Sequence, residues 1–377
     1  TLLAQLGLAK AVFARIRRQS SMQERDMSEP IRLTQYSHGA GCGCKIAPAV
    51  LHNMLSGMKA GPHHPSLLVG NDTKDDAAVV DLGDGTAVIS TTDFFMPIVD
   101  DPHTFGRIAA ANAISDIYAM GGTPLVAIAI FGWPIDKLSE DVAGQVLEGG
   151  RSICEEAGIP LAGGHSIDCP EPIFGLAVTG RVPIEHLQKN AAARPGDMLF
   201  LTKPLGVGIV TTTQKRGNVH PDHLAAAVHS MQSLNVVGAE LSAMAGVHAM
   251  TDVTGFGLMG HLLEMCQGSG TRAEVWGDQV QTFDGVPEYH AQGMVPGGAR
   301  RNYASYGQHL DLPEGYLRDL LCDPQTSGGL LVSVCPDHAD EVAKVLADAG
   351  CPHHPVGRML RKDESLEEGV TVAYRPD

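Results

Sequence analysis

From residue 67 onward, the apolar residues of this 377-residue chain follow two patterns. Short apolar runs bounded by Gly, Pro or Asp predict β-strands, and longer stretches with apolar residues three and four apart predict helices. In the first half, the strand pattern occurs at 77–82, 87–92, 125–131, 159–162 and 175–182. The helical pattern occurs at 105–120 and at 139–158, where Ser139 is a suitable cap. This half is therefore predicted to be a mixed α/β unit.

The apolar runs stop in the polar stretch 185–194, which predicts a join between two domains. Strands are then predicted at 197–202, 273–276, 330–334 and 370–374, and helices at 206–216, 221–244, 256–267 and 339–349. The predicted organisation is an N-terminal extension (1–26), a Gly- and Cys-rich segment with its lead-in (27–66), an N-terminal α/β domain (67–185) and a C-terminal α/β domain (186–377).

Composition narrows the classes of function. The formal net charge of −16 disfavours a broad nucleic-acid surface, because phosphate binding of that kind needs a basic face. No apolar run approaches the roughly 18 residues that a membrane span needs. Eight cysteines, scattered without a dense framework, favour reduced thiols. We therefore expect a cytoplasmic protein that binds neither nucleic acid nor a membrane.

Residues 1–26 differ from the rest, with five basic and two acidic residues and apolar residues at helical spacing. Such a start is typical of a targeting segment or a surface helix. The interpretation that we favour is an upstream extension without catalytic importance.

The densest group of reactive side chains lies at 36–45, in the sequence Tyr-Ser-His-Gly-Ala-Gly-Cys-Gly-Cys-Lys. Its glycines raise the backbone entropy lost on ordering, so a mobile loop is predicted. Cys42 has His38 four residues before it and Lys45 three residues after it. Either cation close to Cys42 would lower the pKa of the thiol and favour the thiolate. The alternative is a Gly-rich turn with incidental cysteines; Cys44 provides no second pair for a structural zinc site.

Several aspartates lie where predicted strands or helices meet glycines or turns, namely Asp75, Asp76, Asp93, Asp252 and Asp323. Asp116 instead lies inside the predicted helix 105–120, among Ala, Ile and Met, and Asn112 precedes it by one turn on the same face. A carboxylate on such a helix is costly to bury unless it is paired or bound to metal, and the alternative is an exposed acid.

Together these acids suggest a site for Mg²⁺, which prefers oxygen ligands and substrate phosphates. Lys45, Lys74 and a predicted turn at 163–166 (Gly-Gly-His-Ser) offer donors for phosphate oxygens. No Walker-type Gly-x-x-x-x-Gly-Lys-Ser/Thr motif occurs, and no Gly-x-Gly-x-x-Gly motif follows a predicted strand. A nucleotide site here is thus expected to be neither a P-loop nor a dinucleotide fold.

Read in order, these motifs resemble the selenophosphate synthetase (selenide, water dikinase) family. The resemblance covers residue 31 to the C-terminus and rests on the loop at 37–46, Asn112 to Asp116, and the motifs at 68–76, 90–95, 163–166, 251–257 and 323–329. The carboxylate motifs are shared with related ATP-using synthetases, and the Cys-Gly-Cys-Lys loop narrows the assignment. Some members of the family carry selenocysteine at the position of Cys42, where this chain has cysteine.

The resemblance implies two mixed α/β domains of the aminoimidazole ribonucleotide synthetase type, which form a homodimer through their N-terminal sheets. It implies that ATP, selenide and water give selenophosphate, AMP and phosphate. Cys42 and Lys45 would be catalytic, and Mg²⁺ would be held by Asp76, Asp116 and Asp252. The residues that would contact ATP are Lys45, Thr73, Lys74, Asp75, Asp93, Asp116, Gly164, His165 and Ser166.

Two other functions remain open from the residues alone. Another ATP-dependent synthetase or kinase of the same fold would have a similar set of aspartates, but the Cys42 segment argues against it. A thiol-based selenium carrier would use the carboxylates only structurally and would have no affinity for nucleotides.

Overall fold

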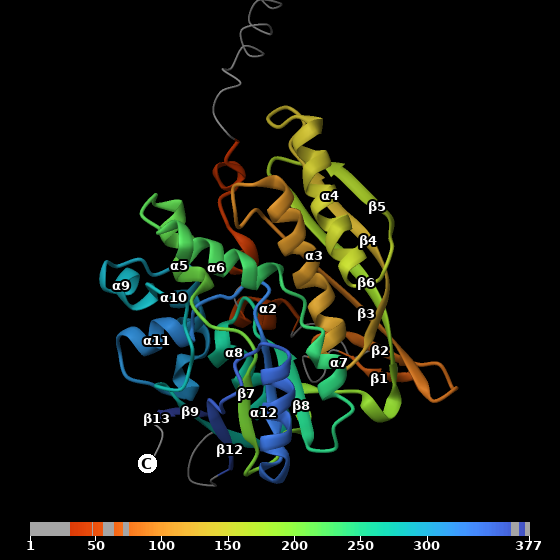
Figure 1. Cartoon of the computed structure of the whole chain (residues 1–377), viewed down its shortest axis with the longest axis vertical. Coiled ribbons are helices and arrows are strands. Elements are labelled where there is room, and N and C mark those ends of the chain that lie inside the picture. Colours follow the sequence, from red (N-terminus) through yellow and green to blue (C-terminus); the bar gives the residue numbers. More distant parts are fainter. Residues whose placement is uncertain (1–30, 47, 56–63, 71–74, 363–368, 374–377) are drawn as a thin grey trace, which may run out of the picture. The chain divides into compact units, whose positions relative to one another are not determined.

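The computed structural model describes residues 31–46, 48–55, 64–70, 75–362 and 369–373 (Figure 1). The chain separates into two units, Thr1–Arg32 and Leu33–Asp377. Nearly all of the first unit, including the predicted extension 1–26, lies outside the described residues. The second unit contains two β-sheets, one from each predicted half of the chain.

The first sheet has six strands in the order β1-β2-β3-β6-β4-β5. Their bounds are Leu67–Val69 (β1), Ala78–Asp81 (β2), Thr86–Phe95 (β3), Thr123–Trp133 (β4), Leu161–Asp168 (β5) and Ile173–Pro183 (β6). Neighbouring strands are antiparallel except β4 and β5, which are parallel. Two helices, α3 (Pro102–Ala119) and α4 (Glu140–Glu156), lie side by side and α3 packs on β3 and β6 (Figure 1).

The second sheet has seven strands in the order β10-β13-β9-β12-β7-β11-β8. Their bounds are Met198–Leu201 (β7), Val247–Asp252 (β8), Thr271–Trp276 (β9), Leu310–Asp311 (β10), Leu330–Val334 (β11), Gly357–Arg361 (β12) and Val370–Ala373 (β13). The helices of this half are Val207–Lys215 (α5), Pro221–Gln232 (α6), Val237–Leu241 (α7), Gly257–Ser269 (α8), Val286–Ala291 (α9), Gly297–Tyr306 (α10), Tyr316–Leu321 (α11) and Ala339–Asp348 (α12).

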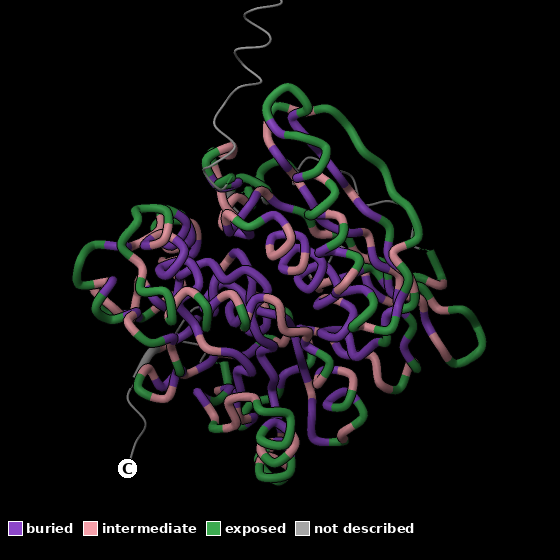
Figure 2. Tube along the Cα trace, turned by 45° about the horizontal axis from the view of Figure 1, so that its top comes forward, coloured by how far each residue is buried: buried purple, intermediate pink, exposed green. Residues whose placement is uncertain are grey.

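Helix α3 is buried on almost every side because it packs on the first sheet, α4, α6, α7 and β8. Its start is fixed by Asp101, whose side chain accepts a hydrogen bond of 2.8 Å from the backbone amide of Thr104. Glycine permits its close contact with α4: a Cβ at Gly106 would collide with the backbone carbonyl of Val146. A helix that is apolar all round is expected in such an interior position. In Figure 2 the buried residues (purple) are concentrated in the middle of the molecule.

The mixed α/β character predicted for both halves is confirmed, and most predicted elements occur within a few residues of their expected bounds. The predicted helix 221–244 is wrong, because the chain becomes extended at Ser233 and only α6 and α7 are helical. The buried side chain of Asn235 donates there to Ser115 and to the carbonyl of Gly328, so tertiary contacts override the helical pattern.

The predicted turn at 163–166 is also wrong, because these residues belong to strand β5 at the edge of the first sheet. Gly164 pairs with Ala129 of β4 and has a φ of 153°, and a Cβ there would collide with the Ala129 backbone. Glycine thus serves close strand pairing at this point.

Strands β1, β8, β10 and β12 were not predicted. The expectation that no Gly-x-Gly-x-x-Gly motif follows a strand is therefore wrong, because Gly255, Gly257 and Gly260 have this spacing between β8 and the first turn of α8. Among the described residues, no helix combines the length and the apolar character needed to cross a membrane.

Candidate active site

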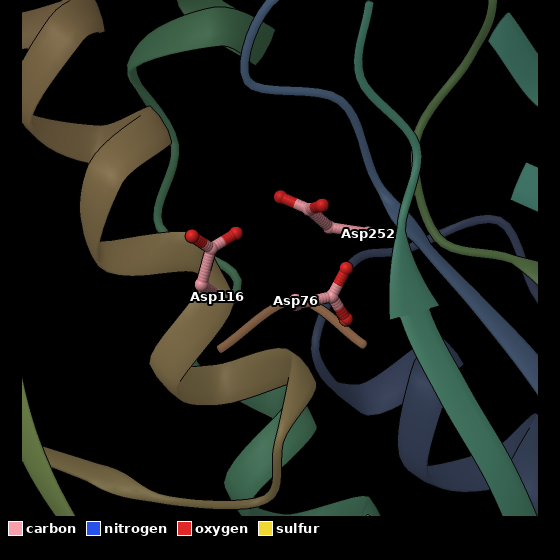
Figure 3. Close-up of side chains that lie close together, drawn as sticks. All are labelled: Asp76, Asp116 and Asp252. Atoms are coloured by element: carbon pink, nitrogen blue, oxygen red, sulfur yellow. The ribbon is translucent and has the colours of Figure 1, made fainter. Parts of the chain in front are cut away.

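Three aspartates from distant parts of the chain meet between the two halves of the second unit. Asp116 projects from α3, Asp252 is the last residue of β8, and Asp76 lies two residues before β2. Each offers a carboxylate oxygen, and these oxygens all lie within 4.8 Å of one another. Figure 3 shows the three side chains pointing toward a common centre. The structure thus brings together the three residues predicted to hold Mg²⁺.

The hydrogen bonds in this cluster leave part of its negative charge without a donor. Thr91 donates to Asp116, and Thr251 donates to Asp76 at 2.8 Å. Yet Oδ2 of Asp76 and Oδ2 of Asp252 are buried without a hydrogen-bond partner. Burial, and then repulsion from Asp252, raises the pKa of Asp76 and Asp116 well above the usual range, and burial raises the pKa of Asp252 to about 6.

A hard divalent cation fits this donor set. Three carboxylates around one centre are oxygen ligands of the kind that Mg²⁺ takes, and a cation there would remove the mutual repulsion. The two unpartnered oxygens offer free lone pairs that a cation can use. The chemistry of the residues therefore agrees with the metal that the resemblance implies.

A second polar group lies beside the cluster and contains the predicted catalytic pair. The Lys45 ammonium lies 3.0 Å from Oδ2 of Asp93, which is part of β3 rather than at its end. Burial alone would lower the pKa of Lys45, but Asp93 and the neighbouring acids raise it well above its usual value. Asn112 on α3 donates to the same Asp93 oxygen at 2.8 Å. Lys45 is therefore a fixed positive charge at the edge of a carboxylate-rich site.

The Cys42 segment is not the irregular loop that its glycines predicted, and Lys45 alone does not give Cys42 a lowered pKa. Residues Gly41–Cys44 form a short 3-10 helix, and Cys42 has no exposed surface. Its thiol donates to Oδ1 of Asn112 at 3.2 Å, and its amide donates to the hydroxyl of Thr326 at 3.0 Å. Burial and then Asp93 raise the pKa of Cys42 well above its usual value, and Lys45 only partly offsets them. The resting group is the neutral thiol.

His38 does not act on Cys42 in this arrangement. Its Nδ1 lies 2.9 Å from a carboxylate oxygen of Glu171, in the connection between β5 and β6, and the imidazole is largely exposed. Cys44 is half-buried and donates to the carbonyl of Gly41 at 2.8 Å. Both halves of the chain hold this segment: the amide of Gly41 donates to the carbonyl of Met96 at 3.0 Å, and Arg301 donates to the carbonyl of Gly43 at 3.0 Å.

The residues predicted to contact ATP fall into three groups. Lys45, Asp93 and Asp116 lie together, and Asp75 lies next to Asp76 and accepts a hydrogen bond from the amide of Asn190 at 2.8 Å. Thr73 and Lys74 lie outside the described residues. Gly164, His165 and Ser166 lie on β5, three strand positions from β3. The structure does not bring this last group together with the aspartates.

Several residues of the site carried no predicted role. Asn112 was noticed only for its position relative to Asp116. Thr326 and Ser327 lie in the connection before β11, and the backbone amide of Ser327 donates to Oδ1 of Asn112 at 2.8 Å. Gly255 permits the contact with the Cys42 segment, because a Cβ there would lie 2.5 Å from the carbonyl of Cys42. The signals in the sequence were weak: Thr326, Ser327 and Gly255 belong to polar, Gly-containing motifs, and Asn112 shares a helix face with Asp116.

Comparison with known families agrees with this architecture in both halves. Residues 74–182 match the model of the AIR synthase related protein, N-terminal domain, and residues 194–367 match that of the AIR synthase related protein, C-terminal domain. Among solved structures, a thiamine-monophosphate kinase from Stenotrophomonas maltophilia has a TM-score of 0.57 at 19% identity and covers 87% of this chain and 96% of its own. A hydrogenase maturation protein HypE in complex with ATP has a TM-score of 0.56 at 20% identity and covers 89% and 91%. The fold is therefore that of the AIR synthase-related proteins, as predicted.

Curated relatives narrow the assignment. A selenide, water dikinase from Aeromonas hydrophila is 59% identical over 87% of this chain and 95% of its own length. One from Escherichia coli O157:H7 is 59% identical over 89% of this chain and 96% of its own length. The chain belongs to the selenide, water dikinase family. The predicted family and the predicted class of enzyme, an ATP-using phosphotransferase, are thus confirmed.

Proposed function

We propose that this protein uses ATP and water to convert selenide into selenophosphate, with release of AMP and phosphate. The proposal rests on one observation. The carboxylate cluster of Asp76, Asp116 and Asp252, which can hold a cation, lies beside the Lys45–Asp93 pair and the buried Cys42 thiol. The names of the relatives support the same reaction. Phosphoryl transfer depends mainly on positioning and charge neutralisation, and these residues provide both.

Asp76, Asp116 and Asp252 are the proposed Mg²⁺ ligands. The bound ion would neutralise phosphate charge during transfer. Lys45 is held by Asp93 and would add a fixed positive charge for a phosphate oxygen. Asp75, Asp93 and Asp116, with Thr73 and Lys74, are the further proposed nucleotide contacts. The unpartnered oxygens of Asp76 and Asp252 are the main support for the metal assignment.

Cys42 is proposed to hold or deliver selenium, with Lys45 as its catalytic neighbour. Selenide is a strong nucleophile, so it needs delivery and protection from oxidation more than activation. The buried position of Cys42 supports a protected route to the nucleotide. Before selenide binds, the neutral Cys42 thiol is held in place by the hydrogen bond that it donates to Asn112.

A homodimer is proposed through the face of the first sheet opposite α3. Exposed apolar residues lie on this face, among them Phe94 (48% exposed) and Ile128 (47%). Gly164, His165 and Ser166 are three strand spacings, about 14 Å, from β3. We therefore propose that these three residues contact the nucleotide of the partner copy.

The proposed domains remain 27–66, 67–185 and 186–377, preceded by the extension 1–26. The proposed cellular setting is the cytoplasm. None of the eight cysteines, all of which the structure describes, forms a disulfide, which favours a reducing compartment.

The experiment compares AMP formation by the wild type, Cys42→Ala and Asp116→Ala, with and without selenide. Wild type should form AMP only with selenide, and both variants should lose this activity. Formation of ADP without any need for selenide would favour another kinase of the same fold. The absence of any thermal shift with Mg-ATP would favour a selenium carrier, because a ligand at a hundred times its Kd adds about 2.7 kcal/mol of stability.

A further inference from the structure

Asn112 joins the two chemically distinct parts of the site through one amide group. Its Oδ1 accepts hydrogen bonds from the Cys42 thiol (3.2 Å) and from the backbone amide of Ser327 (2.8 Å). Its Nδ2 donates to Oδ2 of Asp93 (2.8 Å), the same oxygen that lies 3.0 Å from Lys45. Asn112 is 1% exposed and lies one turn before Asp116 on α3.

The orientation of this amide is determined by its partners. The backbone amide of Ser327 can only donate, so it requires the carbonyl oxygen of Asn112. Asp93 accepts, so it requires the amino group. Both partners select the same orientation. The Cys42 thiol then faces an acceptor and must act as the donor. A thiolate at Cys42 would face the carbonyl oxygen and would be repelled.

The charged groups around the Cys42 thiol act in opposite directions. Asp93, Asp252 and the neighbouring thiol of Cys44 disfavour a negative charge there, and Lys45 favours it. Asn112 is the neutral group that directly contacts both the thiol and Asp93. Loss of Asn112 therefore changes Cys42 without changing the charge of the site.

We propose that Asn112 is a positioning residue that fixes the Cys42 thiol relative to the Lys45–Asp93 pair, and so sets where selenium is presented to the nucleotide. Its role in turnover rests on the proposed function, whereas its hold on Cys42 does not. Asn112 contributes geometry rather than charge, and Ser327 of the second half locks that geometry from the other side.

The first test measures alkylation of Cys42 by iodoacetamide with peptide mass spectrometry, in a Cys44→Ser background so that one thiol is followed. Asn112→Leu keeps a similar volume but offers no acceptor, so labelling of Cys42 should become about tenfold faster, as expected for loss of a hydrogen bond worth about 1 kcal/mol or slightly more. Asn112→Asp keeps an acceptor for the thiol at Oδ1, but its second oxygen replaces the amino group that lies 2.8 Å from Oδ2 of Asp93, so the two carboxyl groups share a proton. Labelling of Cys42 should then stay within about twofold of the wild-type rate, because the thiol keeps its acceptor.

Two controls separate positioning from loosening of the structure. Cys154, Cys266 and Cys322 are buried elsewhere, and their labelling rates in the same samples should stay unchanged. Asn235→Leu removes another buried asparagine, which bonds to Ser115 and Gly328 but has no hydrogen bond to Cys42 or Asp93. It should leave Cys42 labelling unchanged. Equal acceleration in both Asn112 variants, or no change in either, would overturn the proposal.

The second test measures turnover. Asn112→Leu should lower kcat for selenide-dependent AMP formation by about a hundredfold, as expected for a misplaced reacting group, and should retain a thermal shift with Mg-ATP. Unchanged kcat would overturn the role in turnover. If the wild type forms no AMP with selenide, the proposed function fails, while the labelling experiment still decides whether Asn112 positions Cys42.

Discussion

The carboxylate cluster and the Cys42 segment occupy one site, yet their buried polar groups are satisfied in opposite ways. The Cys42 thiol is neutral and has an acceptor in Asn112. Two buried carboxylate oxygens of the cluster have no donor. Burial raises the pKa of both Cys42 and Asp76, but only the Cys42 thiol is stable in its buried position without a bound cation.

This difference separates two kinds of functional residue. A cluster of repelling carboxylates is destabilising until a cation arrives, so it indicates a ligand. A satisfied thiol indicates a group held in position by the protein itself. Changes in the cluster should therefore affect activity and stability in opposite directions, whereas changes around Cys42 should affect activity without such a gain in stability.

The largest expected effect comes from Asp116→Asn. Loss of one proposed ligand should reduce selenide-dependent AMP formation by at least about 10³-fold, because a bound metal ion contributes several kcal/mol to the transition state. The same change removes like-charge repulsion and should raise the stability of the metal-free protein by about 1–2 kcal/mol, the equivalent of one pKa unit or slightly more. Initial rates and urea unfolding measure the two effects.

The exposed Asp136 provides the control, and Asp136→Asn should change neither quantity. A loss of stability in Asp116→Asn would contradict the description of the cluster as internally repelling.

The next effect is the pH dependence of stability. Asp252 has a folded pKa of about 6, above its unfolded value of 3.8, so the folded state binds the proton more tightly. Stability from this group is present at low pH and is lost as the pH rises from about 4 to about 6. The loss should be roughly 3 kcal/mol, and Asp76 and Asp116 act in the same direction.

Urea unfolding at pH 4.5 and pH 7, with and without Mg²⁺, tests this sign. Mg²⁺ should stabilise the protein at pH 7 and have little effect at pH 4.5, where protons compete for the ligands. Equal stabilisation by Mg²⁺ at both pH values would argue against the cluster as its binding site.

The proximity of the three aspartates was also the part of the site that the sequence indicated best. Asp116 was recognisable because a carboxylate in an otherwise apolar helix needs a partner, and local pattern alone shows this. Asp76 and Asp252 came from the family resemblance, and the fold then brought them to the same centre. Strands and helices with strong periodicity, such as α3 and α4, were likewise predictable.

The environment of Cys42 could not be predicted, because it depends on residues far away in the chain. Its amide bonds to Thr326, 284 residues later, and its thiol bonds to Asn112, 70 residues later. Local composition suggested a mobile loop, and long-range packing produced a buried one. Residues 163–166 of the edge strand β5 were mistaken for a turn for a similar reason: Gly164 serves close pairing with Ala129 of β4 rather than chain reversal.

A smaller effect tests the open face of the first sheet, whose apolar residues contrast with the charged site on the covered face. Ile128→Glu places a charge in the proposed dimer interface and should weaken self-association about tenfold or more, as burial of an unpaired charge is costly. Sedimentation equilibrium measures the change. Ile135→Glu is the matched control, because Ile135 is 64% exposed beyond the end of β4 and should not affect association. Equal dissociation constants for both variants would argue against this face.

The smallest expected effect separates the two interpretations of the Cys42 segment. If His38 activated the thiol, His38→Ala would abolish turnover. The structure instead pairs His38 with Glu171 at an exposed position, where such contacts contribute about 0–1 kcal/mol. His38→Ala should therefore change kcat less than about twofold and leave Cys42 alkylation unchanged, because Asn112 and Thr326 hold Cys42 independently of the imidazole. Glu171→Gln removes the same pair from the other side and should match it. A loss of activity in His38→Ala but not in Glu171→Gln would mean that the imidazole acts on the substrate directly.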